Sequence, residues 1–457
     1  MTGGNVSNIF GTIQTTGFGN SNLFLMNPAG FLFGPNATVN VGGMVSFSSS
    51  DYLRLTDGLR FNAVPNSSAD ALLSAAPVAA FGFLGKNHGA ITMQGSQLTV
   101  AGPTVQFPES GDASGLAYVN GVLRQSANLS LIGGDITVQG GTLTAPGGHV
   151  TLVSVGKPSN AKVGGEVSLA GTPTGFSTMG TVTLSQGTAI NVGNSLFAPN
   201  AAVGSVVIRG GQVMLNSATV LTGNTMATTE TPSVTIESRG SIDMRNSSLA
   251  IETETGHVGA IDLTAGKNIT VTDSPLTAHG IYNATGGSLT LTAPTISVSG
   301  STFIAGHDAS GGTISLNATK GVILANTDLI AISYFGRGGT ILINGGNLLD
   351  AQQTTMEAWG AQTGGTIQVR ANKIALTDTQ LLAWALYGQA GLITLDAKST
   401  TLTNSRLQAT HGSSTFEGEG GTIVITSPKF KQTGSVLDVS SGGGPNGTVI
   451  INGIVQP

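Results

Sequence analysis

The chain has 457 residues, of which 68 are Gly, and charged residues make up only 9% of it, against ~25% in an average soluble domain. It contains no Cys, which excludes disulfides, Cys-ligated zinc, thiol catalysis and iron–sulfur clusters. The formal net charge of -5 and the lack of a basic run argue against a nucleic-acid partner, and no apolar run reaches the ~18 residues of a membrane-spanning helix.

The N-terminal part shows no regular repeat. Residues 22–26 and 31–33 are apolar and predict two short strands. Between them lies Asn27-Pro28-Ala29-Gly30, which predicts a β-turn because Pro presets φ at its second position and Gly suits its fourth. Residues 61–85 are rich in Ala and contain two Pro, so we expect an excursion away from the regular fold.

The later part is a repeat built on a Gly-(Thr/Ser)-Ile-x-Leu pattern, with openings 25 to 30 residues apart and about 26 on average. The openings are Gly259, Gly287, Gly312, Gly339, Gly365, Gly391, Gly421 and Gly447, with weaker copies at Gly204 and Ser233. Each repeat holds three short segments that alternate apolar and polar residues, such as 261–263, 269–271 and 276–278. This alternation is typical of half-buried strands.

The repeat predicts an all-β parallel β-helix with three short strands per coil. A single coil cannot bury its inward Ile and Leu, whereas coils stacked ~4.8 Å apart form a continuous core. The scarcity of charge follows, because rows of like charge at that spacing would repel each other. We expect Leu276, Leu329 and Leu381 of the third strands to face this interior.

The position after the third-strand Ala should face outward by alternation. In successive coils it holds His279, Gly306, Ile332, Trp359, Trp384 and Thr410. Both Trp residues of the chain therefore occupy the same predicted slot in adjacent coils, and Tyr334 and Tyr387 follow nearby. We interpret them as a candidate ligand-binding stripe for sugar rings or a protein, against the alternative of stacking that only stabilises the fold.

Two histidines extend this candidate stripe. His279 and His307 each fall 20 residues after the opening Gly of their coil, which predicts that they lie side by side. A pair of His without carboxylates is a weak metal site. We therefore predict no metal, no cofactor and no catalytic residues.

Several N-terminal segments resemble the secretion domain of filamentous haemagglutinin-type exoproteins, the secreted partners of two-partner secretion systems. The segments, in the order found in that family, are NLFLMNPAGFLFGPNATVNVGG, SSSDYLRL, SAAPVAAFGFLG and LSLIGGDITVQGGTLTAPGGHVTLVSVG. The similarity covers roughly residues 2–156. The usual turn of the family is Asn-Pro-Asn-Gly, and here Ala29 replaces the second Asn.

The resemblance implies a right-handed β-helix and a secreted, non-enzymatic adhesin at the bacterial cell surface. Its N-terminal domain would be recognised by an outer-membrane transporter, and its receptor would be a host or matrix glycan or protein. Asn27, Pro28 and Gly30 would form the secretion-motif turn. We expect residues 1–160 to be a shortened secretion domain and residues 161–457 a β-helical shaft. The resemblance also implies that a signal peptide and the start of the domain precede residue 1.

A polysaccharide-binding or polysaccharide-degrading β-helix protein is the alternative. Asn326-Thr327-Asp328 resembles one short motif of polygalacturonases. Glycosidases require two carboxylates that flank the scissile bond, and the sequence has no Asp-Asp pair to accompany this motif. We therefore predict that the protein is not an enzyme.

Overall fold

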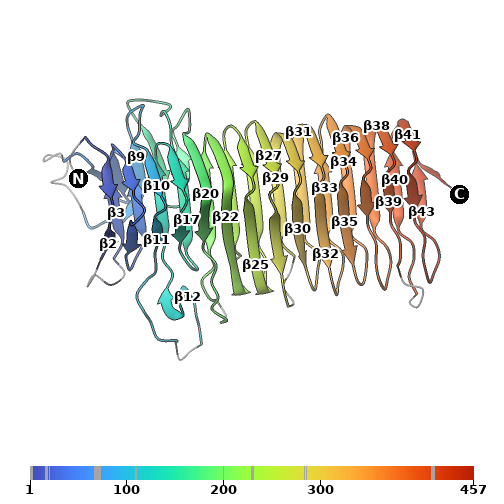
Figure 1. Cartoon of the computed structure of the whole chain (residues 1–457), viewed down its shortest axis with the longest axis horizontal. Coiled ribbons are helices and arrows are strands. Elements are labelled where there is room, and N and C mark those ends of the chain that lie inside the picture. Colours follow the sequence, from blue (N-terminus) through green and yellow to red (C-terminus); the bar gives the residue numbers. More distant parts are fainter. Residues whose placement is uncertain are drawn as a thin grey trace. The chain divides into compact units, whose positions relative to one another are not determined.

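The computed structural model describes residues 4–15, 19, 21–65, 74–108, 111–198, 200–227, 231–282, 284, 286–412 and 417–456. Regular secondary structure within these ranges consists of β strands alone (Figure 1). The chain forms two compact units. Unit 1 comprises residues 1–222 and 234–243, and unit 2 comprises residues 223–233 and 244–457.

Unit 2 is a stack of parallel coils. In the third strands, Leu276 pairs with Phe303, Phe303 with Leu329, Leu329 with Met356, and Met356 with Leu381. Equivalent residues of successive repeats therefore lie in register. The prediction of an all-β parallel β-helix with three strand segments per coil is confirmed.

Three faces make up each coil of unit 2. The first face contains β26 (Ala260–Ala265), β29 (Ser288–Ser299), β31 (Thr313–Ala325), β33 (Thr340–Asn344), β36 (Thr366–Thr377), β38 (Leu392–Thr403), β40 (Thr422–Thr426) and β43 (Thr448–Ile451). The second face adds β27 (Asn268–Thr272), β34 (Leu348–Gln352) and β41 (Lys429–Thr433). The third face contains β25 (Ser248–Gly256), β28 (Leu276–Gly280), β30 (Thr302–His307), β32 (Asp328–Ser333), β35 (Thr355–Gly360), β37 (Gln380–Leu382), β39 (Arg406–Gln408) and β42 (Val436–Asp438).

The first two segments of a coil are often one strand. β29, β31, β36 and β38 each run through the corner between the first and second faces. The pairing register between β29 and β31 shifts at this corner, between Ala293 and Thr295. A bulge lets a strand bend without ending, which explains why two predicted strands are joined here.

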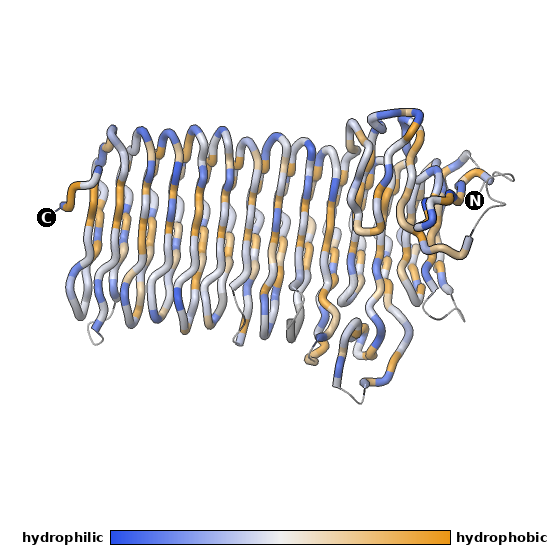
Figure 2. Tube along the Cα trace, turned by 180° about the vertical axis from the view of Figure 1, so that it is seen from behind, coloured by the Kyte–Doolittle hydropathy of each residue, from blue (hydrophilic) through white to orange (hydrophobic). Residues whose placement is uncertain are grey.

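The interior of unit 2 is lined by the predicted apolar residues. Leu276, Leu329 and Leu381 are all 0% exposed, so their predicted inward orientation is confirmed. The residues between them are half-buried or exposed, and Figure 2 shows the resulting mixture of apolar and polar positions along the strands. Burial of this row removes apolar surface from water at about 25 cal/mol per Å².

The opening glycines form a ladder that requires the absence of a side chain. A Cβ on Gly312, Gly339, Gly365, Gly391, Gly421 or Gly447 would lie 2.5 Å or less from the carbonyl oxygen of the equivalent Gly one coil earlier. That oxygen accepts a hydrogen bond from the following coil, as in Thr366 N to Gly339 O at 3.0 Å. Glycine therefore recurs because the backbones stack too closely for any Cβ.

A second ladder turns the chain into the third face. The turn residue has left-handed φ in each coil, as at Asp273 (48°), Asn326 (49°) and Asn404 (48°). Asn and Asp tolerate this conformation better than other residues with a side chain. The buried hydroxyl that follows joins neighbouring coils, since Ser247 N donates to Ser274 Oγ at 3.0 Å.

Unit 1 also contains parallel coils. Its first face holds β1 (Ser7–Ile9), β4 (Phe31–Phe33), β10 (Ile91–Gln94), β15 (Ile136–Gln139), β20 (Thr181–Asn191) and the start of β22 (Gln212–Ala227). Its second face adds β2 (Thr12–Gln14), β5 (Thr38–Asn40), β11 (Gln97–Thr99) and β16 (Thr142–Thr144). Its third face holds β3 (Leu23–Met26), β6 (Val45–Ser48), β14 (Leu129–Gly133), β17 (His149–Ser154) and β21 (Ser205–Gly210). Phe31, Phe33 and Phe47 pack in the interior, with ring centroids 4.8 to 6.2 Å apart.

An antiparallel sheet covers part of the outer side of the third face of unit 1. Its strands are, in order, β19 (Pro173–Thr174), β18 (Gly165–Ser168), β9 (Val78–Phe83), β7 (Tyr52–Leu55) and β8 (Arg60–Asn62). Phe81 and Val167 of this sheet pack against Ile132 and Val153 of the coils. A separate hairpin joins β12 (Leu116–Val119) to β13 (Val122–Gln125). The predicted excursion at 61–85 contributes β9 and part of β8, while residues 66–73 lie outside the described ranges.

Polar contacts fix this covering sheet. The Tyr52 hydroxyl donates to Glu166 Oε1 at 3.0 Å, and Arg54 Nε donates to Glu166 Oε2 at 2.8 Å. Arg60 lies over the Tyr52 ring, 4.0 Å from its centroid. Burial and the hydrogen bond to Glu166 raise the pKa of Tyr52 to about 12.

Candidate functional site

The predicted secretion-motif turn lies at a corner of unit 1. Gly30 N donates to the Asn27 carbonyl oxygen at 2.8 Å, which closes the turn, and Ala29 N donates to Asn27 Oδ1 at 3.0 Å. Asn27 is 1% exposed, and its Nδ2 donates to Asn5 O at 2.9 Å and Ser7 Oγ at 2.8 Å. The Asn27 side chain therefore joins two parts of the chain and is not displayed to a partner.

The same turn stacks directly on the next coil. Gly89 N donates to the Pro28 carbonyl oxygen at 3.0 Å. Gly30 has φ 98°, and a Cβ there would overlap the backbone of Ala90. Pro28 and Ala29 are only half-buried. Asn27 and Gly30 thus build the corner, while Pro28 and Ala29 keep part of their surface accessible.

The predicted aromatic stripe is assembled in unit 2. The Trp359 and Trp384 rings are stacked, with centroids 4.7 Å apart and planes 12° apart. Tyr334 packs edge-on against Trp359 at 5.5 Å and 88°. Both Trp residues are half-buried, whereas Tyr334 and Tyr387 are each 47% exposed. The expectation that the two Trp residues are stacked and partly exposed is confirmed, and their role in binding stays a prediction.

A carboxylate orients the stacked pair. Trp384 Nε1 donates to Glu357 Oε1 at 3.0 Å, from the adjacent coil. Glu357 lies two residues before Trp359 on β35, so both side chains leave the same side of the strand. This contact restricts the rotation of the Trp384 ring. It was missed from the sequence because Glu357 lies two positions away from the slot that carries the aromatic residues.

The rest of the predicted slot is less accessible than alternation suggests. Ile332 is 7% and Thr410 is 6% exposed, and Gly306 is also buried. The Ile332 side chain lies against Gly306, in the space that a side chain at residue 306 would occupy. The expectation that the whole slot is exposed is therefore wrong at these three positions.

The two histidines do not form the expected pair. His279 pairs with Gly306, whereas His307 pairs with Ser333, so they are one residue out of register. The third strands repeat after 27 residues here, while 28 residues separate the two His. His279 is half-buried and lies three coils before Trp359, and the His307 side chain lies outside the described parts. Their predicted adjacency is wrong.

The polygalacturonase-like segment is an ordinary corner of the fold. Asn326 is the left-handed turn residue, and Thr327 is buried with Oγ1 donating to the Ala325 carbonyl oxygen at 3.0 Å. Asp328 begins β32. All three residues thus have the structural role that their counterparts have in other coils.

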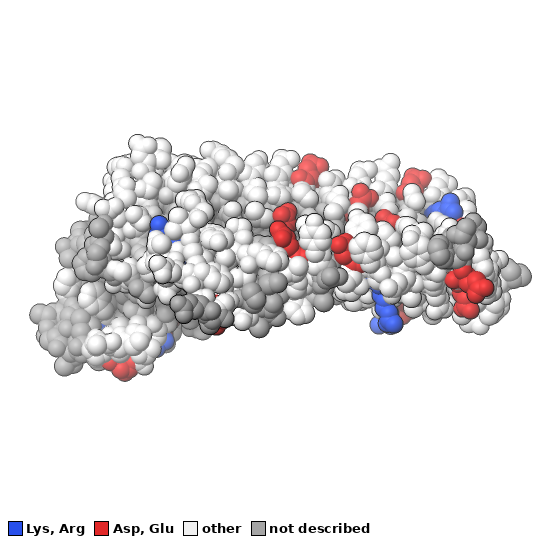
Figure 3. Space-filling model, turned by 90° about the horizontal axis from the view of Figure 1, so that it is seen from below, with Lys and Arg blue, Asp and Glu red and all other residues white. Residues whose placement is uncertain are grey.

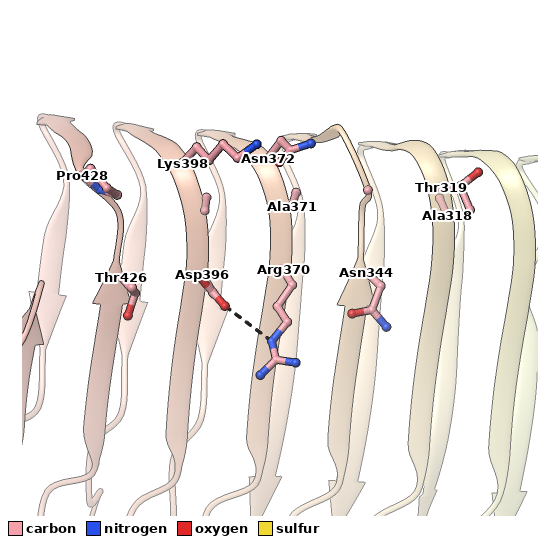
Figure 4. Close-up of a pocket in the computed structure, with 12 residues that line it drawn as sticks. Ala318, Thr319, Asn344, Arg370, Ala371, Asn372, Asp396, Lys398, Thr426 and Pro428 are labelled. Atoms are coloured by element: carbon pink, nitrogen blue, oxygen red, sulfur yellow. Dashed lines mark ion pairs between the residues drawn. The ribbon is translucent and has the colours of Figure 1, made fainter.

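A polar groove crosses unit 2 at the corner after the first face, and sequence reasoning missed it. Figure 4 shows Asn344, Arg370, Asp396 and Thr426 on neighbouring strands, in the register of the strand pairing. The groove has a volume of about 730 Å³, and an ion pair joins Arg370 Nε to Asp396 Oδ2 at 3.7 Å. Both partners are more than half exposed, so this pair adds little stability.

The described ranges contain no group of three or more His, Cys, Asp or Glu that could hold a metal ion. Within the same ranges there is also no helix long and apolar enough to cross a membrane.

The fold and these sites define a parallel β-solenoid with a covering sheet in its N-terminal unit. Residues 1–215 match the family model of the TPS secretion domain. These residues therefore carry a two-partner-secretion domain, and the chain is an exoprotein of the two-partner secretion type.

Among solved structures, the chain is similar to the secretion domain of HMW1 from Haemophilus influenzae, at 12% identity and a TM-score of 0.34. That similarity covers 94% of this chain and 80% of the other. No curated protein matches the chain.

Proposed function

We propose that this protein is a non-enzymatic adhesin whose N-terminal domain is recognised by a dedicated outer-membrane transporter. The observation that carries the proposal is the match of residues 1–215 to the TPS secretion domain. Export through such a partner delivers the chain to the cell surface or the medium, where the repeats of unit 2 present their side chains.

The fold is suited to folding after export. Each coil bonds mainly to its neighbours, so coils can be added one after another from a folded end. The chain has no Cys, so passage through an oxidising compartment creates no disulfides. A net charge of only -5 over 457 residues also limits self-repulsion as the coils stack.

The division of labour along the chain is part of the proposal. Residues 1–160 would serve export and residues 161–457 would serve contact. The family match extends further, to residue 215. The secretion-motif turn at Asn27, Pro28 and Gly30 would act mainly by folding the corner correctly, because Asn27 is buried and hydrogen-bonded within unit 1.

A secretion assay tests the export step. The complete reading frame is expressed with its two-partner transporter, with an unrelated transporter of the same class, and with neither. We expect the protein in the medium or on the cell surface only with its own transporter. Equal release in all three strains would contradict the proposal.

An attachment assay tests the adhesin role separately. Cells that export the protein are compared with cells that lack only this gene, on host-cell and matrix surfaces. We expect weaker attachment without the gene and its recovery when the purified protein is added. Unchanged attachment on every surface would remove the adhesin role and leave the export role intact.

The alternative of a polysaccharide-binding protein is favoured by the stacked Trp359 and Trp384 beside two exposed Tyr residues. Aromatic rings with one apolar face and a polar neighbour are common in sugar-binding surfaces. This alternative is compatible with adhesion, since a surface glycan is itself an attachment target.

A further inference from the structure

The corner that follows the third face carries an exposed aromatic ring in every second coil. The third strands pair His279 with Gly306, Gly306 with Ile332 and Ile332 with Trp359, and the bridge between Gly360 and Ala385 places Trp384 next. Three residues beyond these paired positions, the five coils carry Tyr282, Ala309, Phe335, Gln362 and Tyr387 in turn. Aromatic and smaller residues thus alternate along one row of equivalent positions.

These rings are presented to solvent. Tyr282 is 66%, Phe335 69% and Tyr387 47% exposed, and we call these three residues the aromatic row. Coils stack ~4.8 Å apart, so rings in alternate coils are ~9.6 Å apart. The smaller Ala309 and Gln362 between them are also exposed.

Backbone hydrogen bonds between neighbouring corners hold the row in place. Phe335 N donates to the Asp308 carbonyl oxygen at 2.7 Å, and Tyr387 N donates to the Ala361 carbonyl oxygen at 2.8 Å. Tyr282 N donates to Asp308 Oδ2 at 3.3 Å. The corners are thereby linked to neighbouring coils, so the spacing of the rings follows from the spacing of the coils.

The stacked rings described above support one end of the row. Tyr334 precedes Phe335 and packs on Trp359, which stacks on Trp384, three residues before Tyr387. This arrangement connects two members of the aromatic row through a packed aromatic base. A pre-organised surface loses little conformational entropy when a ligand binds.

Charge near the row is sparse and mixed. Arg337 is exposed, Asp308 and Glu357 are half-buried, and Gln362 adds an amide. Figure 3 shows charged side chains scattered singly or in small groups over one face of the molecule. A polyanion would require a basic surface. An uncharged ligand with many hydroxyl groups fits this mixture better.

We propose that the aromatic row binds an extended, neutral β-1,4-linked polysaccharide that runs along the direction in which the coils stack. A pyranose ring presents an apolar face of C–H groups that packs on an aromatic ring. In an extended β-1,4-linked chain, alternate residues present the same face to the same side. Two pyranose residues in such a chain span about the distance between rings in alternate coils, so each ring meets an equivalent sugar face.

This inference names a ligand class for the adhesin role and rests on it only for its biological setting. The binding is tested on the purified full chain, so failure of transporter-dependent secretion would leave the result unaffected. Conversely, a chain that is exported but binds no glycan would retain the proposed export role and lose this inference.

The first experiment measures binding of β-1,4-linked glucose and N-acetylglucosamine hexamers and dimers by calorimetry. Controls are an α-1,4-linked glucose hexamer and a polygalacturonate oligomer. We expect a β-1,4-linked hexamer to bind at least tenfold more tightly than its dimer, because it spans several rings at once. Binding of the α-linked or charged oligomer with equal affinity, or no binding of either β-1,4-linked hexamer, would overturn the proposal.

Variants then test the row itself. Phe335→Ala should weaken hexamer binding about tenfold or more, whereas Phe197→Ala, which removes a 62% exposed ring in unit 1, should leave it unchanged. Both residues are exposed, so folding should be retained and circular dichroism checks this. Unchanged binding by Phe335→Ala would contradict the proposed contact.

A double variant separates ring spacing from ring number. Phe335→Ala combined with Gln362→Phe keeps the number of exposed rings but moves one into the intervening coil. We expect binding as weak as that of Phe335→Ala alone, because the two-coil spacing is lost. Restored binding would show that aromatic surface alone suffices, as for a protein partner or unspecific adsorption, and would overturn the proposed ligand.

Discussion

The two units use the same coils but stabilise them differently. In unit 1, an antiparallel sheet buries part of the outer side of the third face, and single contacts such as Tyr52 to Glu166 fix it. In unit 2, the same bonds recur from coil to coil, as in the glycine ladder and the Ser/Thr ladder. Unit 1 therefore has an individual surface suited to one partner, whereas unit 2 is a regular scaffold that displays side chains at a fixed spacing.

The glycine ladder should give the largest effect. Gly365→Ala places a Cβ against the carbonyl oxygen of Gly339, and we expect it to lower the free energy of unfolding by about 3 kcal/mol. Gly412→Ala is the matched control, because the nearest atoms to its added Cβ lie 3.6 and 3.9 Å away, and it should cost less than about 0.5 kcal/mol. Urea unfolding measures both, and equal losses would mean that coil stacking does not require Gly.

The individual contacts of unit 1 should come next. Glu166→Ala leaves the buried Tyr52 hydroxyl without its acceptor and breaks the ion pair with Arg54, so we expect a loss of about 2 kcal/mol. Glu252→Ala, at an exposed position in unit 2, should change stability by less than about 0.5 kcal/mol. If urea unfolding shows no difference between the two variants, the covering sheet is not held by this contact.

Alkaline pH should weaken unit 1 in particular. Burial and the Glu166 hydrogen bond raise the pKa of Tyr52 from 10.0 to about 12, so the folded chain holds this proton more tightly than the unfolded chain. The stabilising contribution is complete below pH 10.0 and is lost as the pH rises toward about 12. Tyr52→Phe should remove this step from the pH dependence of thermal unfolding. An identical pH profile in the variant would assign the alkaline loss elsewhere.

The left-handed corners of unit 2 should show the smallest effect. Asn326→Ala puts an unfavourable side chain at φ 49° and should cost about 1 kcal/mol. Asn326→Gly accepts this φ and should cost less. Thermal unfolding of the two variants decides the matter, and a more stable Ala variant would exclude backbone strain as the reason for Asn at this corner.

The sequence predicted the coils of unit 2 well because its signal is repeated. The equal spacing of Gly312, Gly339 and Gly365 set the period, and the inward orientation of Leu276 and Leu329 followed from alternation. The joined strands through the first corner were not predicted, because a bulge changes the register without interrupting the apolar pattern.

Contacts between distant, unrepeated residues could not be predicted. The pairing of Phe81 with Val167 in the covering sheet brings together segments with no shared period. The expected adjacency of His279 and His307 failed because a one-residue difference in coil length moves a residue out of register. The stacking of Trp359 on Trp384 was predictable, since both lie in one strand position.

Transporter-dependent export of matched variants tests the account most directly. Gly30→Ala distorts the secretion-motif turn of unit 1, at φ 98°, and Gly365→Ala distorts a coil of unit 2. With the partner transporter present, we predict that Gly30→Ala abolishes release into the medium, while Gly365→Ala is released but unfolds more easily. Normal release of Gly30→Ala together with a block in Gly365→Ala would contradict the assignment of export to unit 1.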